Sequence, residues 1–193
     1  MPKIQTDKLA QHRDWRRHQL IEAAAAIVLE SGGEAVTVAA VAERAGLSRT
    51  SVYEYFASSA DLTADLVIEE LRSFVKVLND AITNPNDSEK AIAQWIGAAL
   101  QYIADGRHLL AKALSATAAP KDRAAEIGAA HRALLAPLRN SISALGIFDV
   151  DQALAFLQST TDVASKRIEG GAAAEPEIAA TTAFVLAGLK SLT

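Results

Sequence analysis

Long segments with apolar residues three and four positions apart run through most of this chain, and few residues interrupt them. The 193 residues include ten Gly and five Pro, and these breakers fall between the apolar segments. Alternation of apolar and polar residues, the mark of a strand, is nearly absent, and no internal repeat of fixed period is found. The pattern therefore predicts an all-α fold of about nine helices.

The composition excludes several kinds of site. Half of the residues are hydrophobic and 22% are charged, enough for one compact unit or two small ones that share a core. The formal net charge of −4 argues against a nucleic-acid binder that is basic throughout. The chain has no Cys, which excludes disulfides, thiolate metal sites and Cys nucleophiles. We expect no metal or cofactor, no membrane span, no secretory signal and a cytoplasmic setting.

The first helix is predicted from about Trp15 to Ser31, where two glycines end it. A polar arm precedes it, and residues 1–18 carry five basic side chains against two acidic ones. Such an arm is usually a solvated tail. Its place beside the next motif also allows a role in binding.

Two short helices follow, and each begins with its own capping residue. Thr37 is placed to cap the first, and Ser48 the second. Val36 with Val41 forms a hydrophobic staple across the first cap. Gly46 between the helices supplies the left-handed residue that a sharp turn needs. This arrangement is a helix-turn-helix of about 20 residues.

The second of these helices, predicted over residues 49–56, has an apolar and a polar side. Val52 and Phe56 lie one turn apart and face inward. Its outer side carries Arg49, Thr50, Ser51, Tyr53 and Glu54. A helix of this kind suits the major groove of DNA.

A long helix is predicted from residue 59 to about 83, and Asn84-Pro85-Asn86 ends it. Pro137 should kink or interrupt the helix in which it lies. The remaining helices are predicted at 88–104, 107–117, 121–144, 150–169 and 175–191.

Residues 17–62 resemble the tetracycline-repressor (TetR) family of bacterial transcription regulators. The resemblance is carried by the run TVAAVAERAGLS at 37–48 and by RTSVYEYF at 49–56. It implies a three-helix DNA-binding head at 1–58, joined by the long helix to a helical ligand-binding and dimerisation domain at 59–193. It further implies a ligand-responsive regulator, usually a repressor, that binds a palindromic double-stranded DNA operator as a homodimer and is released by a small-molecule effector.

The resemblance also assigns roles to single residues. Arg49 would pair with a guanine edge, and Thr50 and Tyr53 would meet a thymine methyl group or a base edge. Glu54 could accept a hydrogen bond from cytosine, or repel phosphate and raise selectivity. Phosphate contacts fall to Thr37, Ser51, Tyr55 and Ser59, and contacts to the backbone or the minor groove to Arg13, Arg16 and Arg17. The alternative interpretation is that Arg49 and Glu54 merely face solvent and Tyr55 is a core aromatic.

One departure from the family pattern concerns the start of the fourth helix. Ser59 and Ala60 stand where such sequences usually have Lys and then an acidic residue. A phosphate contact is therefore lost, or is replaced by the Ser59 hydroxyl and the helix N-terminus. This departure supports an alternative function: a helical ligand-binding or interaction dimer with weakened or lost DNA binding.

An enzyme is not expected, because the chain lacks the motifs that carry chemistry. There is no GxSxG, Walker or dinucleotide-binding glycine motif. The four histidines, which lie far apart in the sequence and outside any HExxH motif, are His12, His18, His108 and His131.

The last two helices carry apolar stripes that would form the dimer interface. The residues are Leu154, Leu157, Thr161 and Ala164 on one helix, and Ile178, Thr181, Val185 and Leu189 on the other. The alternative is that both stripes are buried within one subunit. The effector pocket is implied by the resemblance alone. Its candidate residues are Trp95 and Tyr102, which share a helix face, with His108, Phe156, His131 and Gln158 as further candidates.

Overall fold

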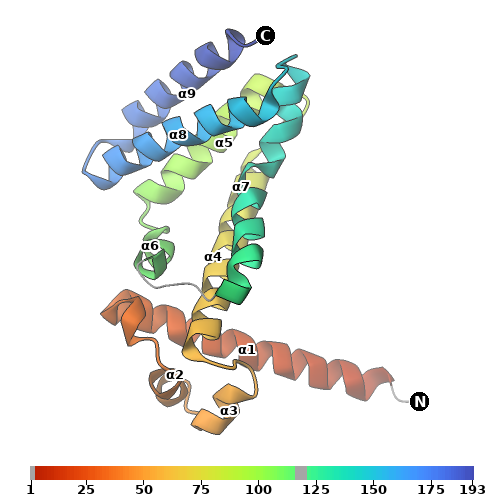
Figure 1. The fold of residues 1–193 in the computed structure, drawn as a ribbon, viewed down its shortest axis with the longest axis vertical. Helices are drawn as coiled ribbons and strands as arrows, with labels where there is room; N and C mark the ends of the chain where they lie inside the picture. The colour runs from red at the N-terminus through yellow and green to blue at the C-terminus, as the bar shows by residue number, and fades with distance from the viewer. Residues whose placement is uncertain (1–2, 116–120) are drawn as a thin grey trace. The chain divides into compact units, whose positions relative to one another are not determined.

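The computed structural model describes residues 3–115 and 121–193, and every regular element in these ranges is a helix (Figure 1). Short 3₁₀ turns occur at η1 (Gly33–Ala35) and η2 (Lys121–Arg123). The α-helices are α1 (Lys3–Ser31), α2 (Val38–Arg44), α3 (Arg49–Tyr53), α4 (Ser59–Ala81), α5 (Ser88–Ala104), α6 (Leu109–Ser115), α7 (Ala124–Ala144), α8 (Val150–Glu169) and α9 (Ala174–Lys190).

The chain packs into two compact units. Unit 1 comprises Met1–Glu70 with Leu109–Gly128, and unit 2 comprises Leu71–His108 with Ala129–Thr193. The first turns of α4 belong to unit 1 because Leu62 and Leu66 are buried there. This division by packing differs from the domain boundary placed at 58/59, which stays a prediction.

Unit 1 contains the helix-turn-helix, and we refer to α1, α2 and α3 as the head. Helix α1 packs against α2 and against α6, and α2 packs against α3. The shared core includes Leu20, Val41, Val52 and Phe56, and Leu114 of α6 is buried in it as well. Full burial of each such side chain stabilises the fold by about 1.5–3 kcal/mol.

The local signals around the turn behave as predicted. The Thr37 hydroxyl accepts a hydrogen bond from the backbone N–H of Ala40 at 3.1 Å, and the Ser48 hydroxyl accepts one from Ser51 at the same distance. Gly46 has φ of 66°, which is the left-handed conformation that a residue with a side chain rarely adopts. The predicted caps and turn are thus confirmed.

Unit 2 is built on three helices that pack side by side, α5, α8 and α9 (Figure 1). Its core is formed by buried residues of these helices together with Leu138 and Ile142 of α7. The ranges of α5 and α8 are those predicted from apolar spacing. The unit therefore has a continuous apolar interior flanked by exposed helix faces.

Besides shifts of one to three residues at ends of α4, α6, α7 and α9, three features differ from prediction. Helix α1 begins at Lys3 rather than near Trp15, because residues 3–14 contain no Gly or Pro and are mostly good helix formers. Helix α3 ends at Tyr53, three residues early. Helix α7 continues through Pro137, which the sequence had marked as an interruption or kink.

Candidate nucleic-acid interface

Helix α3 has one face in the core of unit 1 and one in solvent. Val52 is fully buried, and so is Phe56 just beyond the helix end. The exposed residues are Arg49, Thr50, Tyr53 and Glu54. The polar face predicted from sequence is therefore on the surface.

The side chains of this face are available to a partner. Tyr53 is 57% exposed. The Arg49 guanidinium has no hydrogen-bond or ion-pair partner among the residues that the structure describes. A free guanidinium beside a hydroxyl and a phenol can donate and accept hydrogen bonds at the edge of a nucleobase.

Four hydroxyl residues predicted to touch phosphate lie at helix starts or beside α3. Thr37 is exposed, and its hydroxyl already caps α2. The Ser51 hydroxyl lies 3.0 Å from that of Ser48. Tyr55 is half-buried and packs against the core of unit 1. Ser59 is half-buried at the first residue of α4.

The arginines predicted to reach the DNA backbone lie on α1, not on a flexible arm. Arg13 is exposed, whereas Arg16 is half-buried. Arg17 forms an ion pair with Asp65 of α4, and its guanidinium lies 5.6 Å from the centre of the Phe56 ring. Arg17 is thus engaged inside unit 1, which sequence reasoning missed because Asp65 is 48 residues away.

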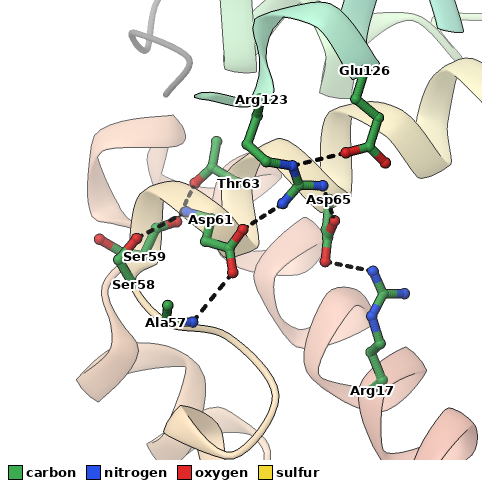
Figure 2. Close-up of polar contacts among 9 residues, drawn as sticks. All are labelled: Arg17, Ala57, Ser58, Ser59, Asp61, Thr63, Asp65, Arg123 and Glu126. Carbon is green, nitrogen blue, oxygen red and sulfur yellow. Dashed lines mark hydrogen bonds and ion pairs between the residues drawn. The ribbon is translucent and has the colours of Figure 1, made fainter. Parts of the chain in front are cut away.

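Arg17 is part of a group that we term the Arg123 cluster: Arg17, Asp61, Asp65, Arg123 and Glu126 (Figure 2). Arg123 donates to Asp61, to Asp65 at 2.6 Å and to Glu126 at 2.9 Å. The i, i+4 spacing of Asp61 and Asp65 signals an acidic face of α4. Their basic partner in the distant segment 121–128 carries no local sequence signal.

A second ion pair holds α2 on α1. Both terminal guanidinium nitrogens of Arg44 donate to the Glu30 carboxylate, one of them at 2.6 Å. The hydrogen bond from Arg44 is the main cause that lowers the pKa of the Glu30 carboxyl. The same bond raises the pKa of Arg44. Arg44 is therefore committed to the packing of the head.

Unit 2 encloses a cavity of about 350 Å³ between helices. It is lined by Phe74, Trp95, Ala99, Ile103, His131, Arg132, Leu134, Leu135, Gln158, Thr161, Asp162 and Ser165. The Trp95 indole donates to the Leu134 carbonyl at 3.0 Å, and the Thr161 and Ser165 hydroxyls donate to carbonyls of their own helix. Burial is the main cause that raises the pKa of the Asp162 carboxyl.

Trp95, His131 and Gln158 were predicted pocket residues and line this cavity. Tyr102 and His108 are not among the described residues that line it. Tyr102 stacks on Phe74 with ring centres 4.3 Å apart, and His108 Nε2 lies 2.9 Å from a Glu169 carboxylate oxygen.

Phe156, the remaining predicted pocket residue, lies on the surface. It borders a different hollow, of about 380 Å³, between α8 and α9. Of the predicted pocket residues, Tyr102, His108 and Phe156 thus lie outside the lining of the cavity beside Trp95, and their predicted role in effector binding stays a prediction.

The stripes predicted for the dimer interface lie inside unit 2. Ile178 is half-buried and packs against the core, and the other seven are buried: Leu154, Leu157, Thr161, Ala164, Thr181, Val185 and Leu189. This is the alternative stated from the sequence, burial within one subunit. The outer faces of the same helices instead expose Phe156, Val163 and Phe184.

Two other kinds of feature are absent from the described residues. No group of three or more His, Cys, Asp or Glu side chains there is arranged to hold a metal ion. No helix in those ranges combines the length and the apolar character that a membrane crossing requires.

The chain is similar to known bacterial transcription regulators. The model of the bacterial regulatory proteins of the tetR family matches residues 20–66, which hold the helix-turn-helix. The HTH-type transcriptional regulator BetI of Brucella canis is 34% identical over 96 residues, 50% of this chain and 46% of that protein. The HTH-type transcriptional activator FasR of Mycolicibacterium smegmatis is 26% identical over 91 residues, 47% of this chain and 42% of that one. The chain thus matches less than half the length of these curated relatives.

Solved structures resemble the chain over nearly its whole length. The fatty acid degradation regulator FadR from Bacillus halodurans has a TM-score of 0.71 at 19% identity, covering 91% of this chain and 96% of that one. FadR from Bacillus subtilis, solved in complex with stearoyl-CoA, has a TM-score of 0.69 at 20% identity, covering 91% and 98%. At these identities the likeness establishes the fold.

Proposed function

We propose that this chain, which belongs to the tetR family of bacterial regulatory proteins, is a transcriptional regulator whose head binds a DNA operator. The observation that carries the proposal is the outer face of α3. Its free Arg49 and exposed Tyr53 stand on a short helix whose other side is fixed in the core by Val52. Such a helix docks rigidly in a major groove. Access to the chromosome requires a cytoplasmic setting.

The proposed contacts divide into base readout and backbone positioning. Arg49 pairs with guanine N7 and O6, and Thr50 and Tyr53 meet neighbouring base edges. Phosphates are contacted by Thr37, Ser51, Tyr55 and Ser59, and by Arg13 and Arg16 of α1. Arg17 is left out of this set because Asp65 already pairs with it.

The operator is proposed to be palindromic, because one short recognition helix reads only a few base pairs and a homodimer doubles the site. The exposed face formed by Phe156, Val163 and Phe184 on α8 and α9 is the proposed dimer surface. Large apolar side chains grouped on a surface mark an interaction site. The opposite faces of α8 and α9 are packed in the core of unit 2 and hold the two helices in place.

The effector is proposed to be an apolar small molecule that fills the cavity beside Trp95. The indole N–H and the hydroxyls of Thr161 and Ser165 already have partners. Apolar contact is offered by Phe74, Ala99, Ile103, Leu134 and Leu135, and polar contact by His131, Arg132, Gln158 and Asp162. The stearoyl-CoA complex of the Bacillus subtilis FadR, a protein of the same fold, supports a ligand with a long apolar chain.

Repression with release by the effector is the proposed mode of action. A ligand that prefers one arrangement of the unit 2 helices shifts the population toward it. Helix α4 carries Phe74 of the cavity wall and begins directly after the loop that follows α3. A tilt of α4 would change the spacing of the two recognition helices, and each 1.4 kcal/mol of misfit lowers affinity tenfold.

The test is to select bound fragments from random DNA with the purified protein. The proposal expects one enriched palindrome, and binding to it should weaken linearly in log–log coordinates as salt is raised. If no duplex is preferred at moderate ionic strength, the alternative of a ligand-binding or interaction dimer takes its place. The Ser59 and Ala60 departure is the observation that favours that alternative.

Effector binding can be followed by the fluorescence of Trp95. Trp15 is 53% exposed and Trp95 only 5%, so a Trp15→Phe variant leaves the cavity tryptophan as the sole indole. Titration with stearoyl-CoA should change its emission in a saturable way and release the operator. Binding that leaves operator affinity unchanged would refute the coupling mechanism.

A further inference from the structure

The Arg123 cluster joins three segments of unit 1 that are far apart in sequence (Figure 2). Arg17 comes from α1, Asp61 and Asp65 from α4, and Arg123 and Glu126 from the segment that begins α7. The Arg123 side chain is only 19% exposed and faces three carboxylates. Its hydrogen bond to Asp65 is the main cause that raises its pKa above the ordinary arginine value.

Asp61 connects Arg123 to the loop that follows the recognition helix. One Asp61 carboxylate oxygen accepts from Arg123, and the other accepts from the backbone N–H of Ala57 at 3.2 Å. The backbone N–H of Asp61 in turn donates to the Ser58 hydroxyl at 3.1 Å. Ala57 is four residues beyond the last residue of α3, so Asp61 fixes the backbone on which α3 ends.

Asp65, one turn farther along α4, connects Arg123 to Arg17 of α1. One of its oxygens accepts from Arg123 at 2.6 Å, and the other accepts from Arg17 of α1 (Figure 2). Arg17 lies over the ring of Phe56, the fully buried residue that follows α3. Through two carboxylates, Arg123 thus reaches both the α3–α4 loop and the helix on which α3 packs through the core.

The helix that starts beside Arg123 continues to the cavity wall of unit 2. Glu126, which also accepts from Arg123, is in the first turn of α7. Leu134 and Leu135 of the cavity wall belong to the same helix, farther along the chain.

We propose that Arg123 is a positioning residue for DNA binding, which holds α3 in its DNA-binding orientation through Asp61 and Asp65. This inference rests on the proposed function. Without Arg123, the carboxylates of Asp61 and Asp65 stand one turn apart on α4 with their main counter-ion removed. Repulsion and the loss of the shared partner loosen the loop at Ala57 and shift α3 from the groove.

The test compares full-length wild type with Arg123→Gln, using the operator obtained by selection and an unrelated duplex of equal length. Arg123→Gln should raise the operator Kd about tenfold, within the usual range of coupling between sites, and leave the Kd for unrelated DNA nearly unchanged. Arg139→Gln is the matched control. It removes the same charge, but from α7 at an exposed ion pair with Asp151, and should leave both Kd values unchanged.

Two further readouts separate positioning from general stability. Amide hydrogen exchange should accelerate at residues 54–58 in Arg123→Gln and stay the same in α8 and α9. Asp61→Asn should weaken operator binding by a similar factor. The double variant, with both Asp61→Asn and Arg123→Gln, should have an operator Kd no higher than either single variant, because each substitution breaks the same network. Arg123→Lys keeps the positive charge but lacks the planar set of N–H donors of arginine. Its operator Kd should therefore lie between that of wild type and that of Arg123→Gln.

The outcomes decide between the two proposals. A folded Arg123→Gln with an operator Kd within twofold of wild type overturns the positioning role and leaves the regulator function standing. Weakening that is equal on operator and unrelated DNA also overturns it, since positioning acts on specific contacts. If Arg123→Gln does not fold, Arg123→Lys is judged by the same ratio of Kd values. A wild type that selects no operator refutes the function itself.

Discussion

At the scale of single residues, the proposed base recognition depends on Arg49. Its free guanidinium can form two parallel hydrogen bonds to guanine, a contact worth about 1–3 kcal/mol of discrimination. Arg49→Ala should therefore raise the operator Kd roughly 5- to 150-fold and relax specificity at one base pair per half-site. Fluorescence anisotropy against single-base operator variants measures both effects.

The control for this prediction is Arg13→Ala. Arg13 is exposed on α1 and is proposed to touch the DNA backbone. Its loss should weaken binding to all DNA sequences alike. It should also reduce the slope of log affinity against log salt concentration by about one. If Arg49→Ala gave this uniform pattern instead, Arg49 would be a phosphate contact and base readout would lie elsewhere on α3.

Glu30 provides a prediction for pH at the same scale. Its carboxyl pKa is lowered in the folded chain, chiefly by the hydrogen bond from Arg44. A lowered carboxyl pKa stabilises the fold above the unfolded value of about 4.3, and the contribution is lost as pH falls through the folded value. The urea midpoint of wild type should exceed that of Glu30→Gln at pH 7, and the difference should shrink as the pH falls below the unfolded value and through the lowered folded one.

The control for the pH experiment is Glu43→Gln on α2. Glu43 is exposed and has no ion-pair partner among the described residues. Its replacement shows how far the loss of one surface charge, with no ion pair broken, changes the urea midpoint. A Glu30→Gln midpoint difference that persisted unchanged to pH 3 would show that the ion pair does not contribute.

At the scale of helices, the turn between α2 and α3 depends on one glycine. Gly46 has a positive φ, and an added Cβ would meet no atom within 4 Å, so the cost of a side chain is strain in the backbone alone. Gly46→Ala should lower the free energy of unfolding by about 1–2 kcal/mol. Chemical denaturation followed by circular dichroism measures it.

Gly97 is the matched control for this substitution. It lies inside α5, and its added Cβ would come within 3.9 Å of Ile178, an ordinary contact. Gly97→Ala should therefore stabilise the chain by about 0.5–1 kcal/mol. If the Gly46 and Gly97 variants changed stability in the same direction, the left-handed turn would not be what Gly46 provides.

Local signals explain what the sequence predicted correctly at this scale. Thr37, Gly46 and Ser48 act on backbone groups within three residues, so cap and turn can be read without knowledge of the rest of the fold. The apolar spacing that located α5 and α8 is equally local. The spacing of Val52 and Phe56 likewise located the outer face of α3, which the structure puts in solvent.

What could not be predicted depends on contacts between distant residues. Apolar spacing shows which face of a helix is buried but not what buries it, so the stripes of α8 and α9 were assigned to a partner subunit. The pairing of Arg17 with Asp65 and the placement of Tyr102 against Phe74 likewise join residues far apart in sequence. Pro137 was expected to kink or interrupt α7; the helix is not interrupted there, and Leu138 and Ile142, which follow Pro137, are buried in the core.

At the scale of the whole molecule, the proposed dimer depends on the exposed face of α8 and α9. Phe184 is 69% exposed there, beside Phe156 and Val163. Apolar side chains of this size left in water are stabilised when a second copy covers them. A glutamate placed at the centre of such an interface would have to be buried without a partner, which costs far more than the contact it replaces.

Phe184→Glu should therefore convert the dimer to a folded monomer, with a dimer Kd raised at least about 30-fold, as for an interface hot spot. Operator affinity should fall with it, because two linked half-sites bind far more tightly than one. Phe148→Glu is the matched control, since Phe148 is fully exposed in the loop before α8 and lies outside this face. Size-exclusion chromatography with light scattering measures the oligomer, and anisotropy measures the binding. A Phe184→Glu variant that stays dimeric and binds the operator like wild type would assign the dimer to another surface.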